Sequence, residues 1–138
     1  MRPHPLALFA ALLLIVTGAC SRTSDPDPLV GTYLATTFRI TPIGQGAANV
    51  LAQGGSLGIN VANNYVTAGT LIMPPTLNGG ITFTASMAGT AVRTESTVRF
   101  MQAADSFVRD LTFTLAGDSL AASQTLAGTA YDLVLRRQ

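Results

Sequence analysis

Residues 119–137, SLAASQTLAGTAYDLVLRR, contain two strand-like runs on either side of a short break at Ala127-Gly128. In the second run, Tyr131, Leu133 and Leu135 recur at every second position and therefore share one face of an extended chain. The first run extends from Ser119 to Thr125. Two such runs joined by a few turn residues predict an antiparallel β-hairpin near the C-terminus.

The same period of two continues through the chain that precedes this hairpin. Leu57, Ile59 and Val61, for example, alternate with polar residues or glycine. No stretch after residue 20 has a helical period, and we expect Ala47 to Gln53 to form a loop or a single turn. The strands that this pattern predicts are Gly31–Ile40, Ser56–Val61, Tyr65–Met73, Ile81–Met87, Thr97–Gln102, Phe107–Leu115, Ser119–Thr125 and Tyr131–Arg137.

About eight short strands in hairpin order form an antiparallel up-and-down meander, and closing it into a barrel removes its exposed edges. A two-sheet β-sandwich shows the same alternation but usually needs crossover connections. Here only Thr41–Gly55 is a long connection. We therefore expect an all-β protein with a small closed barrel, and a β-sandwich is the alternative. The interior of an eight-stranded barrel is just filled by side chains or holds one small ligand.

The N-terminus predicts an export signal. Arg2 precedes the apolar run Leu6–Val16, whose eleven residues would span roughly 16 Å as a helix. That length is about half of a ~30 Å hydrocarbon core, so the run is typical of a cleaved signal peptide and not of a membrane anchor.

Gly18 and Ala19 directly precede Cys20, the only cysteine, and this sequence resembles the lipobox of bacterial lipoproteins. The resemblance implies cleavage before Cys20, diacylation of its thiol and, because Ser21 follows, anchoring at the periplasmic face of the outer membrane. An ordinary secretory signal with a chance cysteine is the alternative.

Three segments follow from this interpretation: a signal peptide over 1–19, an acylated cysteine with a flexible tether over 20–28, and a barrel domain over 29–138. Asp25 and Asp27 lie in the tether, each directly before a proline. We expect them to be solubilising and assign them no site role.

The composition argues against an enzyme. Charged residues make up only 11% of the chain, the formal net charge is +1, and His4 and Cys20 are the only residues of their kinds. His triads, cysteine nucleophiles and Cys/His zinc sites are therefore excluded from the domain, and no basic cluster suits a nucleic acid. We expect no catalytic residues, no cofactor and no metal. The acids outside the tether fall at predicted turns or on outward faces: Glu95, Asp105, Asp110, Asp118 and Asp132.

Gly31-Thr32-Tyr33 opens the first strand in a way that resembles the Gly-x-Trp motif of lipocalins and related calycin barrels. The resemblance implies that Thr41–Gly55 is the long loop that partly covers a lipocalin mouth. It also implies that Arg136 or Arg137 on the last strand packs over Tyr33, as a structural closure by a cation–π contact worth ~1 kcal/mol.

Arg109 is the one charged residue that shares strand parity with the apolar residues around it, so we expect it inside the barrel or at its rim. One hypothesis is that Arg109 near the mouth, with Tyr131 deeper inside, receives the carboxylate or phosphate of an amphipathic ligand. The other is that Arg109 is a rim residue paired with a loop acid such as Asp105. In the first hypothesis the ligand tail contacts Phe83, Phe100, Leu111 and Phe113.

Three function classes are compatible with this sequence. The first is an envelope lipoprotein, monomeric and held to the membrane through Cys20, whose barrel binds or carries a small hydrophobic or amphipathic ligand. The second is a barrel with a filled core that binds an envelope protein, in the manner of a protease inhibitor, through the loops Thr41–Gly55 and Met73–Gly80. The third, an integral outer-membrane barrel, is disfavoured because the outward strand faces are rich in Thr and Ser.

Overall fold

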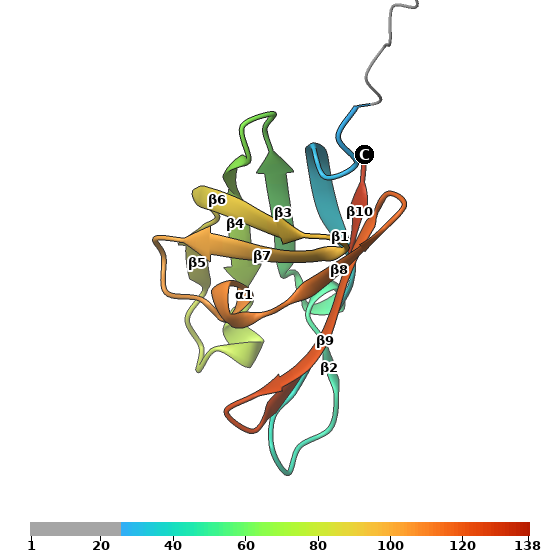
Figure 1. The fold of residues 1–138 in the computed structure, drawn as a ribbon. Coiled ribbons are helices and arrows are strands. Elements are labelled where there is room, and N and C mark those ends of the chain that lie inside the picture. The colour runs from blue at the N-terminus through green and yellow to red at the C-terminus, as the bar shows by residue number, and fades with distance from the viewer. Residues whose placement is uncertain (1–25) are drawn as a thin grey trace, which may run out of the picture.

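The computed structural model describes residues 26–138, which form a closed antiparallel up-and-down barrel of eight strands with two additional strands (Figure 1). The barrel closes where the last strand pairs with the first, from Tyr33 opposite Arg137 to Thr41 opposite Ala130. Residues 1–25, and with them the predicted signal peptide and Cys20, lie outside the described residues. The strands of the barrel are, in spatial order, β1 (Gly31–Thr41), β3 (Ser56–Val61), β4 (Val66–Met73), β6 (Gly89–Thr94), β7 (Thr97–Gln102), β8 (Phe113–Ala116), β9 (Ser119–Leu126) and β10 (Thr129–Arg137).

The other elements are short and gather around one end of the barrel (Figure 1). The strand β2 (Ala48–Asn49) pairs with the end of β1, and β5 (Phe83–Ser86) pairs with the end of β4. Single 3-10 turns occupy Leu51–Gln53 and Pro75–Leu77, and α1 (Phe107–Asp110) is one helical turn. The prediction of a closed barrel is confirmed, and the expected turn within Ala47–Gln53 is present.

Two strand predictions are wrong in detail. The sequence pattern did not predict β6, because Ala91 is the only buried residue of this strand and Val92 is half exposed on the outer face. Of the predicted strand Ile81–Met87, only Phe83–Ser86 forms a strand, β5, which lies off the closed path of the barrel, and Ile81 is 70% exposed. The number of barrel strands is eight as expected, but β6 stands where β5 was predicted.

The third difference is α1, because the predicted strand Phe107–Leu115 begins only at Phe113. A helical turn buries Val108 and Leu111 together, three positions apart, whereas a strand would turn them to opposite faces. The Arg109 guanidinium also lies 2.7 Å from the Asp105 carboxylate, at the i, i+4 spacing that supports a helical turn.

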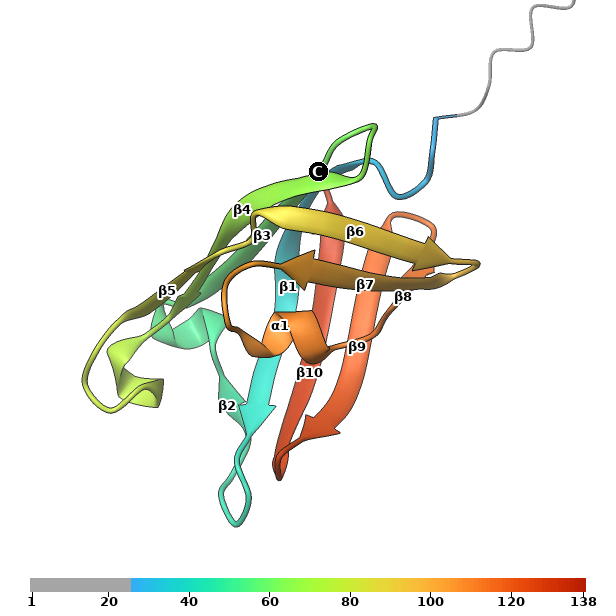
Figure 2. The ribbon, with the colours of Figure 1, turned by 60° about the vertical axis from the view of Figure 1, so that its left-hand side comes forward.

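The turn α1 fills an interruption in the barrel wall (Figure 2). Strand β7 pairs with β8 only at Thr97 and Val98, so the edge of β7 from Arg99 to Gln102 has no strand partner on that side. Strand β9 likewise pairs with β8 only over Ser119 to Ala121. Beyond this ladder, the backbone N–H of Thr112 donates to the side-chain oxygen of Gln124 and not to a backbone carbonyl of β9. Within the described chain, α1 therefore packs where two sheet edges are open.

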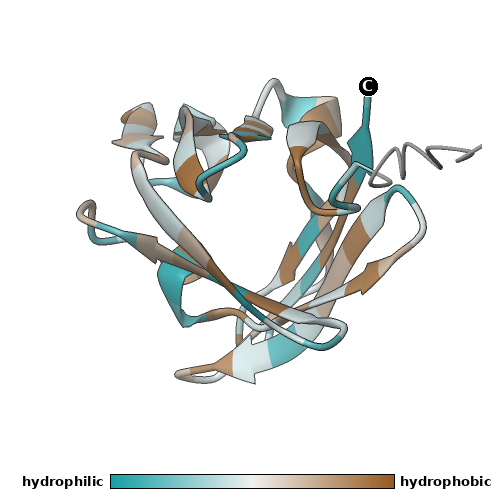
Figure 3. Ribbon diagram, turned by 45° about the horizontal axis from the view of Figure 1, so that its top comes forward, coloured by the Kyte–Doolittle hydropathy of each residue, from teal (hydrophilic) through white to brown (hydrophobic). Residues whose placement is uncertain are grey.

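Side chains from every strand fill the barrel interior. Hydrophobic and hydrophilic positions alternate along the strands that surround it (Figure 3). Phe100 and Phe113 meet edge to face with ring centroids 5.3 Å apart, and both rings are fully buried. The largest fully buried side chains are Tyr33, Phe38, Phe100, Phe113, Leu29, Leu57, Ile59, Leu71, Met87, Leu111, Leu120 and Leu133. The middle of the barrel is therefore a packed hydrophobic core.

The end of the barrel where the described chain begins is closed. Leu29 is fully buried there, and the Tyr33 hydroxyl donates to the carbonyl oxygens of Leu29 and Pro28 at 3.0 and 3.1 Å. The guanidinium of Arg137 lies over the Tyr33 ring, 5.7 Å from its centroid. Arg136, the other residue considered for this contact, is exposed. The turn between β9 and β10 lies at the opposite end (Figure 1).

Candidate binding pocket at the mouth of the barrel

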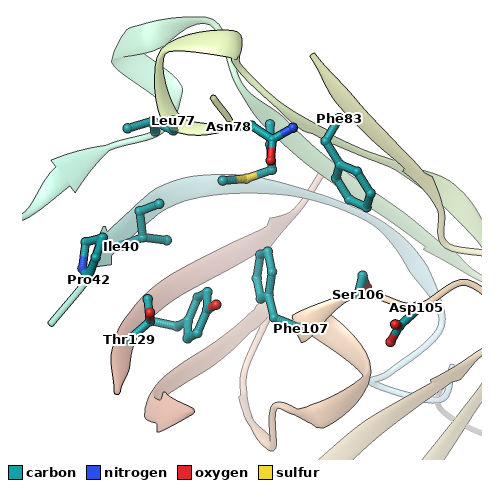
Figure 4. A pocket seen from close by; sticks show the side chains of 11 residues that line it. Ile40, Pro42, Leu77, Asn78, Phe83, Asp105, Ser106, Phe107 and Thr129 are labelled. Carbon is teal, nitrogen blue, oxygen red and sulfur yellow. The ribbon is translucent and has the colours of Figure 1, made fainter. Parts of the chain in front are cut away.

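An open pocket of about 410 Å³ lies at the end of the barrel opposite the closed one (Figure 4). The ends of β1 and β4, the start of β10, the strand β5 and the segment around α1 meet there, and β5 lies off the closed path of the barrel. The residues that line it are Ile40, Pro42, Met73, Leu77, Asn78, Phe83, Asp105, Ser106, Phe107, Thr129 and Tyr131.

Aromatic rings separate this pocket from the core. Phe107 stacks on Tyr131 with centroids 4.4 Å apart and planes 18° apart, and it also meets Phe38 at 5.8 Å in a tilted contact. Phe38 is fully buried, whereas Phe107 and Tyr131 are half-buried. Burial raises the pKa of the Tyr131 phenol above its ordinary value. Phe107 thus closes the core and presents an aromatic surface to the pocket.

Polar contacts on both sides hold α1 in place. Arg109 forms ion pairs with Asp105 at 2.7 Å and with Asp110 at 3.6 Å. The Ser106 hydroxyl donates to the Gln102 side-chain oxygen at 3.2 Å. The hydrogen bond to Gln102 joins this segment to the end of β7, and the two ion pairs connect residues within 105–110.

The structure separates the residues that were predicted to bind a ligand. Tyr131 and Phe83 line the pocket, whereas Phe100, Leu111 and Phe113 are fully buried in the core. The strand position predicted for Arg109 is wrong because residues 107–110 are helical. Arg109 itself does not line the pocket, and its guanidinium pairs with Asp105 at the pocket rim and with Asp110 outside the lining. The alternative pairing with Asp105 is the arrangement present.

The mouth contains residues that the sequence interpretation missed. Met73 ends β4, and Leu77 and Asn78 come from the turn between β4 and β5, which has no periodic pattern. Phe107 was assigned to a strand face, although the spacing of Asp105 and Arg109 was a readable sign of a helical turn. Of the predicted mouth loop Thr41–Gly55, only Pro42 lines the pocket.

Asp27 was placed in the tether without a role, yet its carboxylate joins three parts of the closed end. It accepts from the Tyr65 hydroxyl at 2.5 Å and from the backbone N–H of Leu29 at 2.9 Å, and Arg93 lies 3.4 Å away. The Tyr65 hydrogen bond, with the Leu29 N–H and the charge of Arg93, holds the pKa of Asp27 below its usual value. Asp27 is therefore a structural residue of the barrel.

A second hollow, of about 440 Å³, lies on the outer wall over β1, β3 and β4. Gly58 and the half-exposed Leu34 both line it, and a β-carbon at Gly58 would lie 3.1 Å from Cδ2 of Leu34. Its lining contains no aromatic and no ionisable residue. The mouth pocket differs from this hollow because its lining contains aromatic rings, several polar groups and one carboxylate.

Over residues 26–138, no three His, Cys, Asp or Glu side chains cluster in a way that could hold a metal ion. Among these same residues, no helix is long and apolar enough to cross a membrane. Comparison with protein-family models, with curated proteins and with solved structures found no match to this chain.

Proposed function

We propose that this protein is a lipoprotein of the bacterial cell envelope, anchored through Cys20, with a lipocalin-like barrel that binds a small hydrophobic or amphipathic molecule. The observation that carries the proposal is the mouth pocket of about 410 Å³, lined mainly by apolar and aromatic side chains. Pockets for small ligands are usually concave and mostly apolar, and have volumes of roughly 300 to 1,000 Å³.

The packed core determines where such a ligand lies. Because Phe100, Phe113 and Leu133 fill the interior, the ligand binds at the mouth, between Phe83 and the Phe107–Tyr131 pair, and not inside the barrel. The described chain starts at the closed end of the barrel, opposite the mouth (Figure 1). The tether to Cys20 therefore joins the barrel at the end that the ligand does not use.

Anchoring is tested by replacing Cys20 with serine in a bacterial host. We expect the chain with its native Cys20 to incorporate labelled palmitate and to sediment with membranes. The Cys20→Ser chain should do neither, and should be secreted in soluble form. Equal labelling of both chains would remove the lipoprotein part of the proposal.

Ligand binding is tested by native mass spectrometry of the mature Cys20→Ser chain purified without detergent, and by titration with the neutral fluorescent probe N-phenyl-1-naphthylamine. Phe83→Ser should weaken probe binding, because Phe83 lines the pocket and is 37% exposed. Val92→Ser is the matched control, since Val92 is 51% exposed on the outer face of β6. No bound molecule and no probe binding would reject ligand carriage.

One observation favours a protein-binding barrel as the second candidate. Ile43 and Ile81 are 80% and 70% exposed on loops beside the mouth, and large exposed apolar side chains are common where proteins associate. A photo-crosslinking residue at position 43 or 81, compared with one at position 92, would test this function in cells. A discrete adduct from the two loop positions alone would support it.

A further inference from the structure

The charge of the mouth pocket limits the chemistry of the ligand, a step that rests on the function proposed above. Asp105 is the only lining residue with a formal charge, and its side chain is 93% exposed at the rim. Arg109 pairs with both Asp105 and Asp110, so these three residues together carry one net negative charge. An anionic head group would meet this charge and find no cation among the lining residues.

Two polar groups of the lining favour the same kind of ligand. The Asn78 amide nitrogen donates to the carbonyl oxygen of Ile81 at 2.9 Å, and the Ser106 hydroxyl donates to Gln102. Asn78 thus uses one of its two N–H groups and Ser106 its only hydroxyl proton within the protein, while the hydroxyls of Thr129 and Tyr131 can donate or accept. In Figure 4 the amide oxygen of Asn78 faces the opening, and the Asp105 carboxylate lies at its edge. These oxygens are acceptors, and they suit a ligand that brings donors or positive charge.

Aromatic faces complete the site. Phe83 approaches the opening from β5 and Phe107 from α1, and Tyr131 also lines it (Figure 4). The face of an aromatic ring attracts an ammonium or quaternary ammonium group within about 6 Å of the ring centre. Several rings beside one carboxylate form the arrangement by which proteins recognise such cations.

We infer that the mouth pocket selects cationic amphiphiles, with an ammonium head group on an apolar body, over carboxylates of the same length. The ammonium group lies between the aromatic rings and Asp105, and the apolar body contacts Ile40, Met73 and Leu77. This selectivity is opposite to that of the hypothesis from the sequence, in which Arg109 receives the carboxylate or phosphate of an amphipathic ligand.

The test uses three ligands with the same dodecyl chain, below their micelle-forming concentrations: dodecyltrimethylammonium, dodecanol and dodecanoate. Each displaces N-phenyl-1-naphthylamine from the mature Cys20→Ser chain in low-salt buffer, because salt screens an exposed carboxylate. We expect the ammonium compound to bind roughly tenfold more tightly than dodecanoate, as two contacts of about 0.7 kcal/mol each would give.

Variants identify the groups responsible. Asp105→Asn should reduce the ammonium-to-carboxylate ratio severalfold, whereas Asp110→Asn, which removes the same charge and also pairs with Arg109 but lies outside the lining, should change it less. Phe83→Leu should weaken ammonium binding and leave dodecanol binding nearly unchanged, because leucine keeps the apolar contact and loses the ring. Thermal unfolding of each variant verifies that the barrel remains folded.

The outcomes separate the two proposals. Dodecanoate binding as tightly as the ammonium compound, or an unchanged ratio in both Asp105→Asn and Phe83→Leu, would overturn the inference and leave ligand binding intact. Failure of all three ligands to displace the probe would overturn the inference and the small-molecule function together.

Discussion

Replacing Phe107 with alanine tests whether α1 is a packed part of the barrel. The substitution removes a stacked contact with Tyr131 and a tilted contact with Phe38. Each aromatic contact contributes about 1 kcal/mol beyond the buried area. Half-burying a phenylalanine ring adds roughly 1 kcal/mol. We therefore expect Phe107→Ala to lower the free energy of unfolding by about 2–3 kcal/mol, or the melting temperature by roughly 10 °C for a domain of this size.

The assay is thermal and urea unfolding followed by circular dichroism, with Phe107→Leu as the control that keeps an apolar side chain and loses the ring. A double-mutant cycle with Tyr131→Leu isolates the stacked pair, and its coupling energy should be about 1 kcal/mol. A loss below about 0.5 kcal/mol for Phe107→Ala, with no coupling to Tyr131, would refute the description of Phe107 as the ring that closes the core.

Three further predictions concern the barrel itself. The lowered pKa of Asp27, caused first by the Tyr65 hydrogen bond, stabilises the fold above the unfolded-state pKa near 3.8, and this contribution is lost as the pH falls through the folded-state value. Asp27→Asn should therefore lower the melting temperature at pH 7, and the difference should shrink toward pH 2; a constant difference would contradict this. Gly69→Ala should cost about 3 kcal/mol or more in urea unfolding, because a β-carbon there would lie 2.0 Å from a backbone oxygen of β3 and φ is +135°; a stable variant would show that this strand can shift. Arg137→Lys keeps the charge but loses the planar guanidinium over Tyr33, so it should lower the free energy of unfolding in urea by about 1 kcal/mol. An unchanged free energy of unfolding would show that the cation–π contact does not stabilise the barrel.

The barrel was predictable because burial and strand parity agree along most of the chain. In β10, Leu133 and Leu135 are fully buried as their alternation indicated. In β6 the signal fails, since Ala91 is small and Val92 faces outward. At residues 107–111, the apolar residues are compatible both with a strand and with one helical turn. Tertiary packing, together with the Asp105–Arg109 ion pair, stabilises the helical turn.

The pocket was less predictable than the barrel. Phe83 and Tyr131 were identified as ligand contacts because they are aromatic at inward parity, and both line the mouth. Leu77 and Asn78 belong to an aperiodic turn, and their position depends on β5 leaving the closed path. A pocket formed where strands separate is a property of the tertiary structure, and strand periodicity does not encode it.

The position of α1 in the barrel wall also matters for association between molecules through strand edges. The edge of β7 from Arg99 to Gln102 and the edge of β9 beyond Ala121 have no strand partner on the side that α1 occupies. Open edges of this kind accept strands from other chains. Residues 107–115 have a strand-like pattern, so a copy of this segment from a second molecule has the sequence needed to enter the same gap. By occupying this gap, α1 covers two strand edges that would otherwise be open to a strand from another molecule.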